Sequence, residues 1–229
     1  MGGVEKEEMI EIQLLKHNHP LEVLCIGAHS DDIEIGCGGT ILKLLEDPCQ
    51  VSFHWVVLSS DKQRRDEAIA SAQTLIAKAA RKTIVVKDFR DGFFPYVGGD
   101  IKDYFEQLKR EVCPDLVFTH YRADLHQDHR LVSELTWNTF RNHLILEYEV
   151  VKYDGDLGRP NAFVPLDEAF CEAKIRHVLD HFPSQTENQW FSADTLRAIL
   201  RIRGIESNSA SHMAEGFYVR KLILAMPKS

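Results

Sequence analysis

Several features that mark other classes of protein are missing from this sequence. No apolar run approaches the roughly 20 residues that a membrane-spanning helix needs, and residues 1–20 are acidic, without the basic start and apolar centre of a signal peptide. The five cysteines are odd in number and contain no CxxC pair, which argues against a disulfide framework and a cysteine zinc site. We therefore expect a cytoplasmic protein with reduced, mostly buried thiols and no membrane span.

Clustered positive charge is also scarce. The chain has 27 Lys and Arg residues against 35 Asp and Glu residues, which gives a formal net charge of −8. Binding to nucleic acid depends largely on clustered basic side chains that neutralise phosphates, so we expect no nucleic-acid partner. A small-molecule partner suits this excess of acidic residues better, and the same charge balance is compatible with a homo-oligomer.

Short apolar runs alternate with longer amphipathic segments along most of the chain. The runs predict strands, the segments between them predict helices, and each crossover is long enough for a right-handed βαβ unit. The predicted strands are 22–28, 51–59, 83–89, 115–121, 144–153 and 217–224, and the predicted helices are 37–46, 64–80, 99–112, 129–142, 167–182 and 192–203. We expect a single α/β domain over residues 1–229, with a Rossmann-like doubly wound, mostly parallel sheet and helices on both faces, in which residues 150–229 complete the substrate pocket.

Polar residues gather where the predicted strands end. Open parallel sheets bind ligands outside the carboxyl ends of their strands, and the stretch GAHSDDIEIGCGGT, residues 27–40, places His29, Asp31 and Asp32 directly after the first strand. Adjacent carboxylates repel each other, so this cluster favours a bound cation. Adjacent aspartates after a strand are also typical of a turn or a helix cap. When this stretch is considered by itself, that alternative stays open.

A second polar cluster, HYRADLHQDHR at residues 120–130, holds three histidines and two aspartates. Zinc prefers imidazole nitrogen and carboxylate oxygen, and its catalytic sites commonly have three protein ligands with one position open for water. His29, Asp32 and His129 would supply such a set and predict one zinc ion per chain, although another divalent metal would suit the same ligands. Asp31 would then remain free to act as a general base toward the activated water.

Together, the AHSDDIEIGCGGT and HQDH segments resemble the two signature motifs of the LmbE-like family, which includes the PIG-L type N-acetylglucosaminyl deacetylases. The resemblance implies an LmbE-like fold with zinc ligation by His29, Asp32 and His129. It also implies that Asp31 is the general base.

Three further motif positions need interpretation. His126 matches a histidine that assists the tetrahedral intermediate, which implies a protonated His126 in the catalytic site. Asp128, between the two histidines of HQDH, would orient or charge His126. The family motif usually reads His-Pro-Asp-Asp, so Ser30 is a departure, but serine replaces no ligand and we expect the site geometry to survive.

Weaker matches to the family extend over most of the chain. Arg64 and Glu67 in QRRDEA resemble an Arg-x-x-Glu helix start whose arginine contacts substrate, and Asp91 in FRDGFF resembles a sugar-binding aspartate. The HFPSQ segment at 181–185 resembles a further family element. Arg64 and Asp91 are therefore expected to bind substrate, although Arg65 competes for the role of Arg64 and Asp-Gly is also ordinary turn chemistry.

Other features of the sequence carry alternative interpretations. The glycines of GCGG suggest a dinucleotide site, but that fingerprint requires G-x-G-x-x-G between strand and helix, whereas Gly36 follows Gly27 by nine positions across a charged cluster. We expect these glycines to allow close approach of neighbouring elements. His120 is expected to be structural or to line the rim, Trp190 to pack in the core or to stack on a sugar, and the polar loop 154–167 to form part of a specificity wall.

These features predict a zinc-dependent hydrolase that removes the N-acetyl group from an N-acetylated amino sugar linked to a nucleotide, a lipid or a small molecule. Two alternatives remain: a non-catalytic sugar- or nucleotide-binding module of the same fold, and a zinc hydrolase of another amide or ester. The presence of every catalytic-type residue of the two motifs favours the enzyme, namely His29, Asp31, Asp32, His126 and His129.

Overall fold

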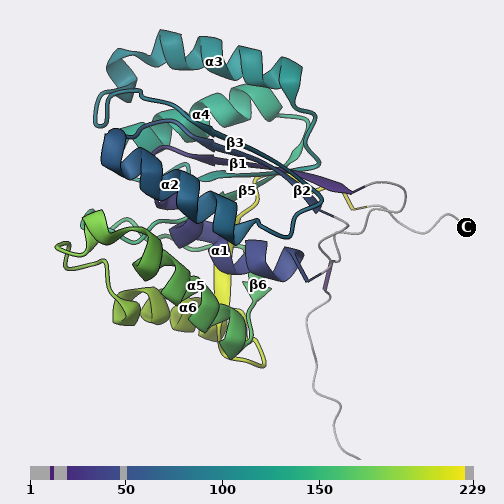
Figure 1. Cartoon of the computed structure of the whole chain (residues 1–229). Helices are drawn as coiled ribbons and strands as arrows, with labels where there is room; N and C mark the ends of the chain where they lie inside the picture. Colours follow the sequence, from purple (N-terminus) through teal and green to yellow (C-terminus); the bar gives the residue numbers. More distant parts are fainter. Residues whose placement is uncertain (1–10, 13–19, 47–50, 225–229) are drawn as a thin grey trace, which may run out of the picture.

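The computed structural model describes residues 11–12, 20–46 and 51–224. These residues form a seven-stranded sheet in the order β3-β2-β1-β4-β5-β7-β6 (Figure 1). Neighbouring strands from β3 to β5 are parallel, and β7 runs antiparallel to both of its neighbours, so the predicted mostly parallel sheet is confirmed. The strands are β1 (Leu21–Gly27), β2 (Val51–Val57), β3 (Arg81–Val86), β4 (Leu116–His120), β5 (Leu144–Tyr148), β6 (Ala162–Pro165) and β7 (Ala214–Tyr218).

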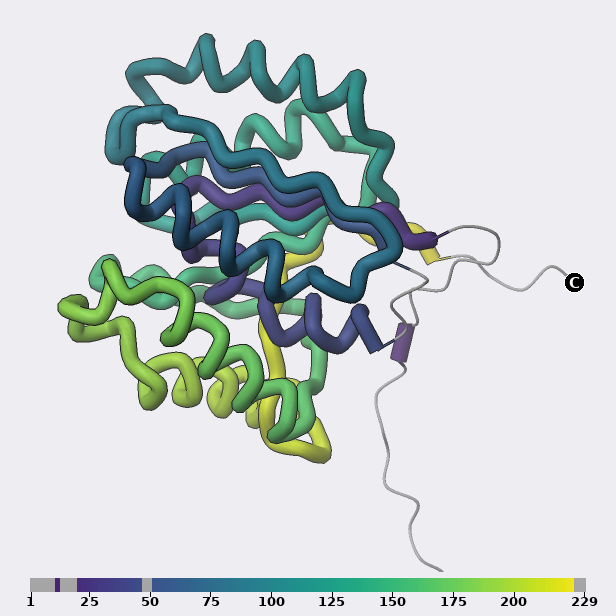
Figure 2. The backbone as a smooth tube through the Cα atoms, in the orientation of Figure 1, coloured from purple at the N-terminus to yellow at the C-terminus, as the bar shows by residue number. Residues whose placement is uncertain are grey.

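Helices cover both faces of the sheet, as a doubly wound fold requires. Figure 1 shows α3 and α4 on one face and α1, α2, α5 and α6 on the other. In Figure 2 the green and yellow C-terminal helices form a layer against α1 and α2. The helices are α1 (Asp32–Leu44), α2 (Lys62–Leu75), α3 (Gly98–Glu111), α4 (Gln127–Phe140), α5 (Glu168–His181) and α6 (Ala193–Glu206), with short 3₁₀ turns η2 (Phe94–Tyr96) and η3 (Pro183–Gln185).

The position of β1 inside the sheet, between β2 and β4, explains why its sequence is continuously apolar. Its side chains alternate between two cores, with Val23 and Cys25 packed on the α1 side and Leu24 and Ile26 packed on the side of α3 and α4. Because helices cover both faces, neither set of side chains faces water. The apolar run therefore places the first motif at the end of a strand that is buried on both sides.

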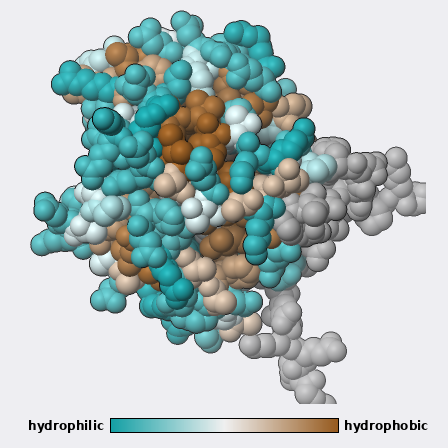
Figure 3. Space-filling view, in the orientation of Figure 1, coloured by the Kyte–Doolittle hydropathy of each residue, from teal (hydrophilic) through white to brown (hydrophobic). Residues whose placement is uncertain are grey.

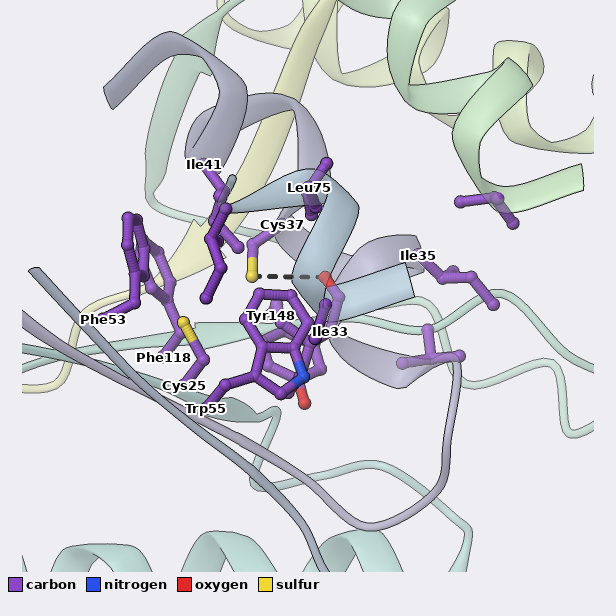
Figure 4. Close-up of a cluster of buried hydrophobic side chains, with 14 of the residues drawn as sticks. Cys25, Ile33, Ile35, Cys37, Ile41, Phe53, Trp55, Leu75, Phe118 and Tyr148 are labelled. Atoms are coloured by element: carbon purple, nitrogen blue, oxygen red, sulfur yellow. Dashed lines mark hydrogen bonds between the residues drawn. The ribbon is translucent and has the colours of Figure 1, made fainter. Parts of the chain in front are cut away.

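Figure 4 shows the core on the α1 side, where Cys25, Cys37 and Trp55 converge. Burial raises the pKa of both thiols well above the usual value, so they stay protonated. The expectation of free, mostly buried thiols is confirmed for the described part of the chain, while Cys49 lies outside it. The free cysteines there are Cys25, Cys37 and Cys171, which are buried, and Cys113, which is exposed.

Several elements differ from the prediction, among them β5, which ends at Tyr148 rather than at 153, and α2, which ends at Leu75 rather than at 80. Helix α1 begins at Asp32 rather than at 37, because the GCGG segment continues the helix with one non-helical residue at Cys37 (φ −141°, ψ 17°). Strand β6 lies within 154–167, which the sequence presents as a loop. It is a short edge strand that pairs with β7, so it needs no long apolar run. The last strand ends at Tyr218 rather than at 224.

The face of the molecule in Figure 3 is mainly hydrophilic, with hydrophobic residues gathered in separate areas. Within the described ranges, no helix is both long and apolar enough to cross a membrane. The large apolar side chains of the central strands instead fill the two cores on either side of the sheet.

Candidate active site

The predicted site residues meet where the strand order of the sheet reverses. Strands β1 and β4 are neighbours, but the loops that follow them lead to α1 and α4 on opposite faces (Figure 1). Such a divergence opens a crevice at the carboxyl ends of the strands. The loop after β1 carries His29–Asp32, and the loop after β4 ends at His126, the N-cap of α4, with His129 in the first turn of that helix.

His29, Asp32 and His129 lie close enough together to hold one metal ion. His29 Nδ1 is 3.1 Å from His129 Nε2 and 3.4 Å from Asp32 Oδ2, and Asp32 Oδ1 is 3.5 Å from His129 Nε2. Bonds of about 2.0–2.2 Å at tetrahedral angles place neighbouring ligand atoms about 3.3–3.5 Å apart. The donor types and the spacing of the two histidine nitrogens suit a zinc site, whereas Asp32 approaches His29 with one carboxylate oxygen and His129 with the other.

The same cluster offers other ligand combinations. The predicted set is not itself one of these groups, but two of them share two of its members and the third shares His29. In the part of the chain that the structure describes, the groups with ligand atoms within 4.8 Å of one another are His29, His126 and His129; Asp32, His120 and His129; and His29, Asp91 and Asp128.

Carboxylates orient the two histidines of the predicted set. His129 Nδ1 lies 2.9 Å from Asp124 Oδ2, and His29 Nε2 lies 3.0 Å from Asp91 Oδ1. Partners of this kind fix the tautomer and the ring orientation of metal-ligating histidines. They leave His29 Nδ1 and His129 Nε2 facing each other across the site.

His120 lies behind the site. It is fully buried, its ring stacks on the ring of His129 with centroids 3.9 Å apart, and its Nε2 is 3.2 Å from Asp32 Oδ2. The backbone N–H of Ala28 donates to the same nitrogen at 2.9 Å. These contacts agree with a structural role for His120 beside two of the predicted ligands, and His120 is also a donor in one of the groups given above.

The charges of the cluster favour the metal-binding protonation state in two of the three predicted ligands. The third, His29, is the exception, because burial lowers its pKa but Asp32, Asp128 and Asp91 together raise it well above the usual value. Burial, with His120 beside it, lowers the pKa of His129 to about 3, so its imidazole is neutral. Burial alone would raise the pKa of Asp32, but His129, His120 and His29 hold it well below the usual value. Metals bind neutral imidazole and ionised carboxylate, so both residues are ready to act as ligands.

Asp31 stands apart from the ligand set although it adjoins Asp32 in the chain. It is buried, and Arg64 Nη2 donates to its Oδ1 at 2.8 Å. Burial raises the pKa of Asp31 to about 6, against the opposing effect of Arg64 and with a further contribution from Asp32. A carboxyl group with a pKa near neutrality can both accept and return a proton.

His126 and Asp128 differ from their predicted arrangement. The backbone N–H of Asp128 donates to His126 Nδ1 at 3.3 Å, while the Asp128 carboxylate accepts from the N–H groups of Gly92 and Phe94 and lies 3.3 Å from His29 Nε2. Asp128 thus orients His29 rather than His126. Burial, and then the neighbouring His29, lower the pKa of His126, so the expected protonated ring is corrected to a neutral one whose proton lies on Nε2.

Arg64, Asp91 and His126 line the same pocket as Asp31 and the three predicted ligands. Arg65, the competitor of Arg64, instead donates to the carbonyl of Val86. The structure therefore brings every predicted site residue except Asp128 to the pocket wall, and Asp128 lies directly behind His29.

The part of the pocket wall that follows β5 in the chain combines residues that the sequence does not identify with others that it does. Lys152 and Tyr153 follow β5 in a stretch without a motif, and Asp154 is the member of the predicted 154–167 wall that lines the pocket. Gln185 belongs to HFPSQ, so the family resemblance was the available signal for it. Trp190 packs against the core, which confirms one of its two interpretations, and it also lines the pocket, where stacking on a sugar stays a prediction.

Two further motif residues, Glu67 and Ser30, are both in described parts of the chain but differ in whether they have hydrogen-bond partners. Glu67 accepts hydrogen bonds from the Ser184 hydroxyl at 2.6 Å and from its backbone N–H at 3.1 Å, which joins α2 to the HFPSQ segment. Ser30 is fully buried, and its hydroxyl has no hydrogen-bond partner within the described ranges. The structure gives no role to serine at this position.

Comparison with known proteins places this cluster in a family. A family model described as PIG-L, GlcNAc-PI de-N-acetylase, matches residues 24–140, which contain both motifs. The chain belongs to the PIG-L family. A relative among curated proteins, the uncharacterized deacetylase YaiS of Escherichia coli (strain K12), is 30% identical over 169 residues, which cover 69% of this chain and 89% of the relative.

Solved structures share the fold of this PIG-L protein. The N,N'-diacetylchitobiose deacetylase from Pyrococcus horikoshii is 26% identical with a TM-score of 0.61, covering 86% of this chain and 83% of that one. The 4-carboxy-2-hydroxymuconate hydratase from Pseudomonas putida KT2440 is 19% identical with a TM-score of 0.69, covering 91% of this chain and 100% of that one, which shows the fold alone. The family and its deacetylase relatives identify the chain as an N-deacetylase enzyme.

Proposed function

We propose that this PIG-L protein is a zinc-dependent deacetylase that hydrolyses the N-acetyl group of an amino sugar. The observation that carries the proposal is the 3.1–3.5 Å spacing of the ligand atoms of His29, Asp32 and His129, with the separate carboxyl group of Asp31 lining the same pocket. Hydrolysis of an amide needs an electrophile for the carbonyl oxygen and a base for the attacking water. A metal in this cluster beside Asp31 would meet both needs.

The three ligands would hold one zinc ion, which supplies polarisation of the amide carbonyl and a lowered pKa for the attacking water. Asp31 would remove the proton of that water and then protonate the departing amine. Arg64 bonds one oxygen of Asp31 at 2.8 Å, so the other oxygen is left for the proton. His126, neutral with its proton on Nε2, would donate to the oxygen that gains negative charge.

Recognition of the sugar would fall to the outer part of the pocket. The Asp91 side chain is 59% exposed and offers a carboxylate to sugar hydroxyls, beside Arg64. Trp190 supplies an aromatic surface of the kind on which the apolar face of a pyranose packs. Trp190 and Gln185 come from the last third of the chain, so we also propose that residues 150–229 complete the pocket within a single domain of residues 1–229.

The hydratase neighbour is a reason to test the reaction itself, because one fold can host different chemistries. Activated water does not by itself select an acetyl group, so another amide or an ester is the competing substrate class. The chitobiose deacetylase neighbour makes N-acetylglucosamine units the first choice of substrate.

The experiment is acetate release from a panel of N-acetyl amino sugars, free and linked to nucleotides, lipids or small aglycones. O-acetyl esters and N-acetyl amides without a sugar are included as the competing classes. We expect the zinc-loaded protein to release acetate from N-acetyl sugars, and His29→Ala, which removes a ligand, to lose both zinc and activity. Hydrolysis confined to esters or to non-sugar amides would contradict the proposal.

A further inference from the structure

Lys152 is a buried cation between two buried carboxylates, next to the metal-binding cluster. Its Nζ is 3.0 Å from Asp124 Oδ2 and 2.5 Å from Asp156 Oδ2, and the three side chains are 9%, 3% and 5% exposed, in that order. A buried charge is costly unless it is paired. The positions of these three groups therefore depend on one another.

Asp124 connects this group to a predicted metal ligand. Its Oδ2, the oxygen that Lys152 contacts, also lies 2.9 Å from His129 Nδ1, and its Oδ1 accepts the backbone N–H of His126 at 2.8 Å. Because Nδ1 of His129 faces Asp124, Nε2 is the nitrogen that faces His29. The orientation of His129 thus depends on where Asp124 is held.

The same contacts join the pocket wall after β5 to the segment that carries His129, the predicted metal ligand. Asp156 Oδ2 accepts the backbone N–H of Leu125 at 2.7 Å, just before the N-cap of α4. Lys152 itself lines the pocket, and so do Tyr153 and Asp154. Lys152 therefore belongs both to the wall that faces substrate and to the support of His129.

We infer that Lys152 is a positioning residue, which acts through Asp124 to hold His129 in its metal-ligating orientation and which links that ligand to the pocket wall after β5. The inference rests on the proposed function, in which His129 is a zinc ligand. Without Lys152, Asp124 would lose the ammonium group that holds its Oδ2 beside His129, and Asp124 and Asp156 would be buried carboxylates with no cation between them.

The test is the zinc affinity of Lys152→Met, measured by competition with a chromophoric chelator, together with the visible spectrum of the cobalt(II)-substituted protein. Partners of metal-ligating histidines typically contribute about 10–100-fold to metal affinity, so we expect the zinc Kd to rise by about that factor. The cobalt spectrum should change because the coordination by His129 changes. Lys152→Arg should recover part of the lost affinity because it keeps the positive charge. A folded Lys152→Met protein with wild-type zinc affinity and spectrum would overturn the inference.

Lys174→Met is the matched control. Lys174 is also a buried lysine in an ion pair, with Glu215 at 2.6 Å, but its other bond goes to the carbonyl of Ile35. This variant should lose stability and keep the zinc affinity of the wild type, whereas an equal loss of affinity would mean that any buried lysine has this effect and would overturn the inference.

A second variant covers the case in which Lys152→Met does not fold. The Lys152→Met/Asp156→Asn double variant restores the balance of buried charge, and its asparagine oxygen can still accept from Leu125. Reduced zinc affinity in this protein supports the inference, and wild-type affinity overturns it. A wild-type chain that binds no zinc would instead overturn the proposed function, and this inference with it.

Discussion

Asp31 and Asp32 are adjacent in the chain, yet their surroundings give them different chemistry. Asp32 faces three histidines, which outweigh burial and hold its pKa well below the usual value. Asp31 is buried beside Arg64, and burial raises its pKa to about 6. The first state suits a permanent metal ligand, and the second suits a group that accepts and returns a proton.

We expect Asp31→Asn to keep the metal and lose catalysis. Asparagine has nearly the same size as aspartate but cannot accept the proton, and a general base typically contributes about 10²–10⁴-fold to the rate. Acetate release should fall by about that factor, while the zinc content stays at the wild-type level. Asp66→Asn, at an exposed position of α2, is the control and should stay active. An active Asp31→Asn enzyme would exclude the base role.

Glu34 predicts a dependence of stability on pH. It is buried, its Oε2 has no hydrogen-bond partner within the described ranges, and burial raises its pKa from 4.5 to about 8. Between these pH values the unfolded chain ionises this group while the folded chain keeps it protonated, so stability is lost as pH rises from 4.5 to 8. At about 1.4 kcal/mol for each pKa unit, the loss is on the order of 5 kcal/mol.

Glu34→Gln cannot ionise and should escape this loss. Its free energy of unfolding, measured with denaturant, should gain on that of the wild type as the pH is raised from 5 to 8. Glu187→Gln, at an exposed position, should show no such gain. Parallel pH profiles for Glu34→Gln and the wild type would show that Glu34 does not stay protonated in the folded chain.

The central residues could be predicted because two motifs carry them, but their supporting contacts could not. His29, Asp32 and His129 converge as the sequence indicates. The partners of Asp128 depend on where the chain places Gly92, before η2, and Phe94, at the start of η2, and no local pattern reveals this. Lys152 reaches Asp124 across 28 positions and belongs to no motif.

At the scale of elements, the glycines of α1 determine how closely the helix approaches the sheet. A Cβ added at Gly36 would lie 2.2 Å from Tyr148 Cδ2, and the Tyr148 hydroxyl is fixed by its hydrogen bond to the Ile26 carbonyl at 2.7 Å. A Cβ at Gly39 would lie 2.4 Å from Leu166 Cδ1. These contacts confirm that the glycines allow close approach of neighbouring elements.

Gly36→Ala should therefore destabilise the protein by overpacking, at the upper end of the usual 1–3 kcal/mol or beyond (~3 kcal/mol). Gly38→Ala is the matched control in the same helix, because its Cβ would meet Lys174 Cγ at 3.6 Å, an ordinary contact. Alanine favours a helix by about 1 kcal/mol over glycine, so this variant should be neutral or stabilised. Equal denaturation midpoints for the two variants would contradict the packing explanation.

The elements themselves were predictable where both faces are covered. The apolar runs of β1, β2 and β4 are continuous because two cores enclose them, and that pattern is visible in the sequence. Strand β6 was not predictable because it is an edge strand of four residues that ends at Pro165. Helix α1 starts earlier than predicted because its glycines are packing positions within the helix.

At the scale of the molecule, the fold brings together two motifs that are about a hundred positions apart. His29 and His129 come from loops after adjacent strands, so the parallel sheet alone is enough to juxtapose them. The doubly wound topology could therefore predict the ligand cluster. The far wall of the pocket, with Lys152 and Trp190, depends on how the C-terminal helices pack, which periodicity does not specify.

Zinc should stabilise the whole domain, because its predicted ligands join loops from two parts of the sheet. A ligand that binds the folded state alone stabilises it by about 2.7 kcal/mol at a concentration a hundred times its Kd. For a chain of 229 residues this corresponds to a rise in Tm of about 5–10 °C. His129→Ala should lose the shift, and His143→Ala, whose ring packs near Phe140 away from the cluster, should keep it.

The most direct test of zinc-dependent deacetylation is the acetate released from an N-acetylated amino sugar as metal-stripped protein is titrated with zinc. We expect no release without metal, and a recovery that reaches its plateau near one zinc ion per chain. Acetate release that survives complete removal of metal would contradict the proposed site. So would a folded, zinc-loaded chain that releases no acetate from any N-acetyl amino sugar.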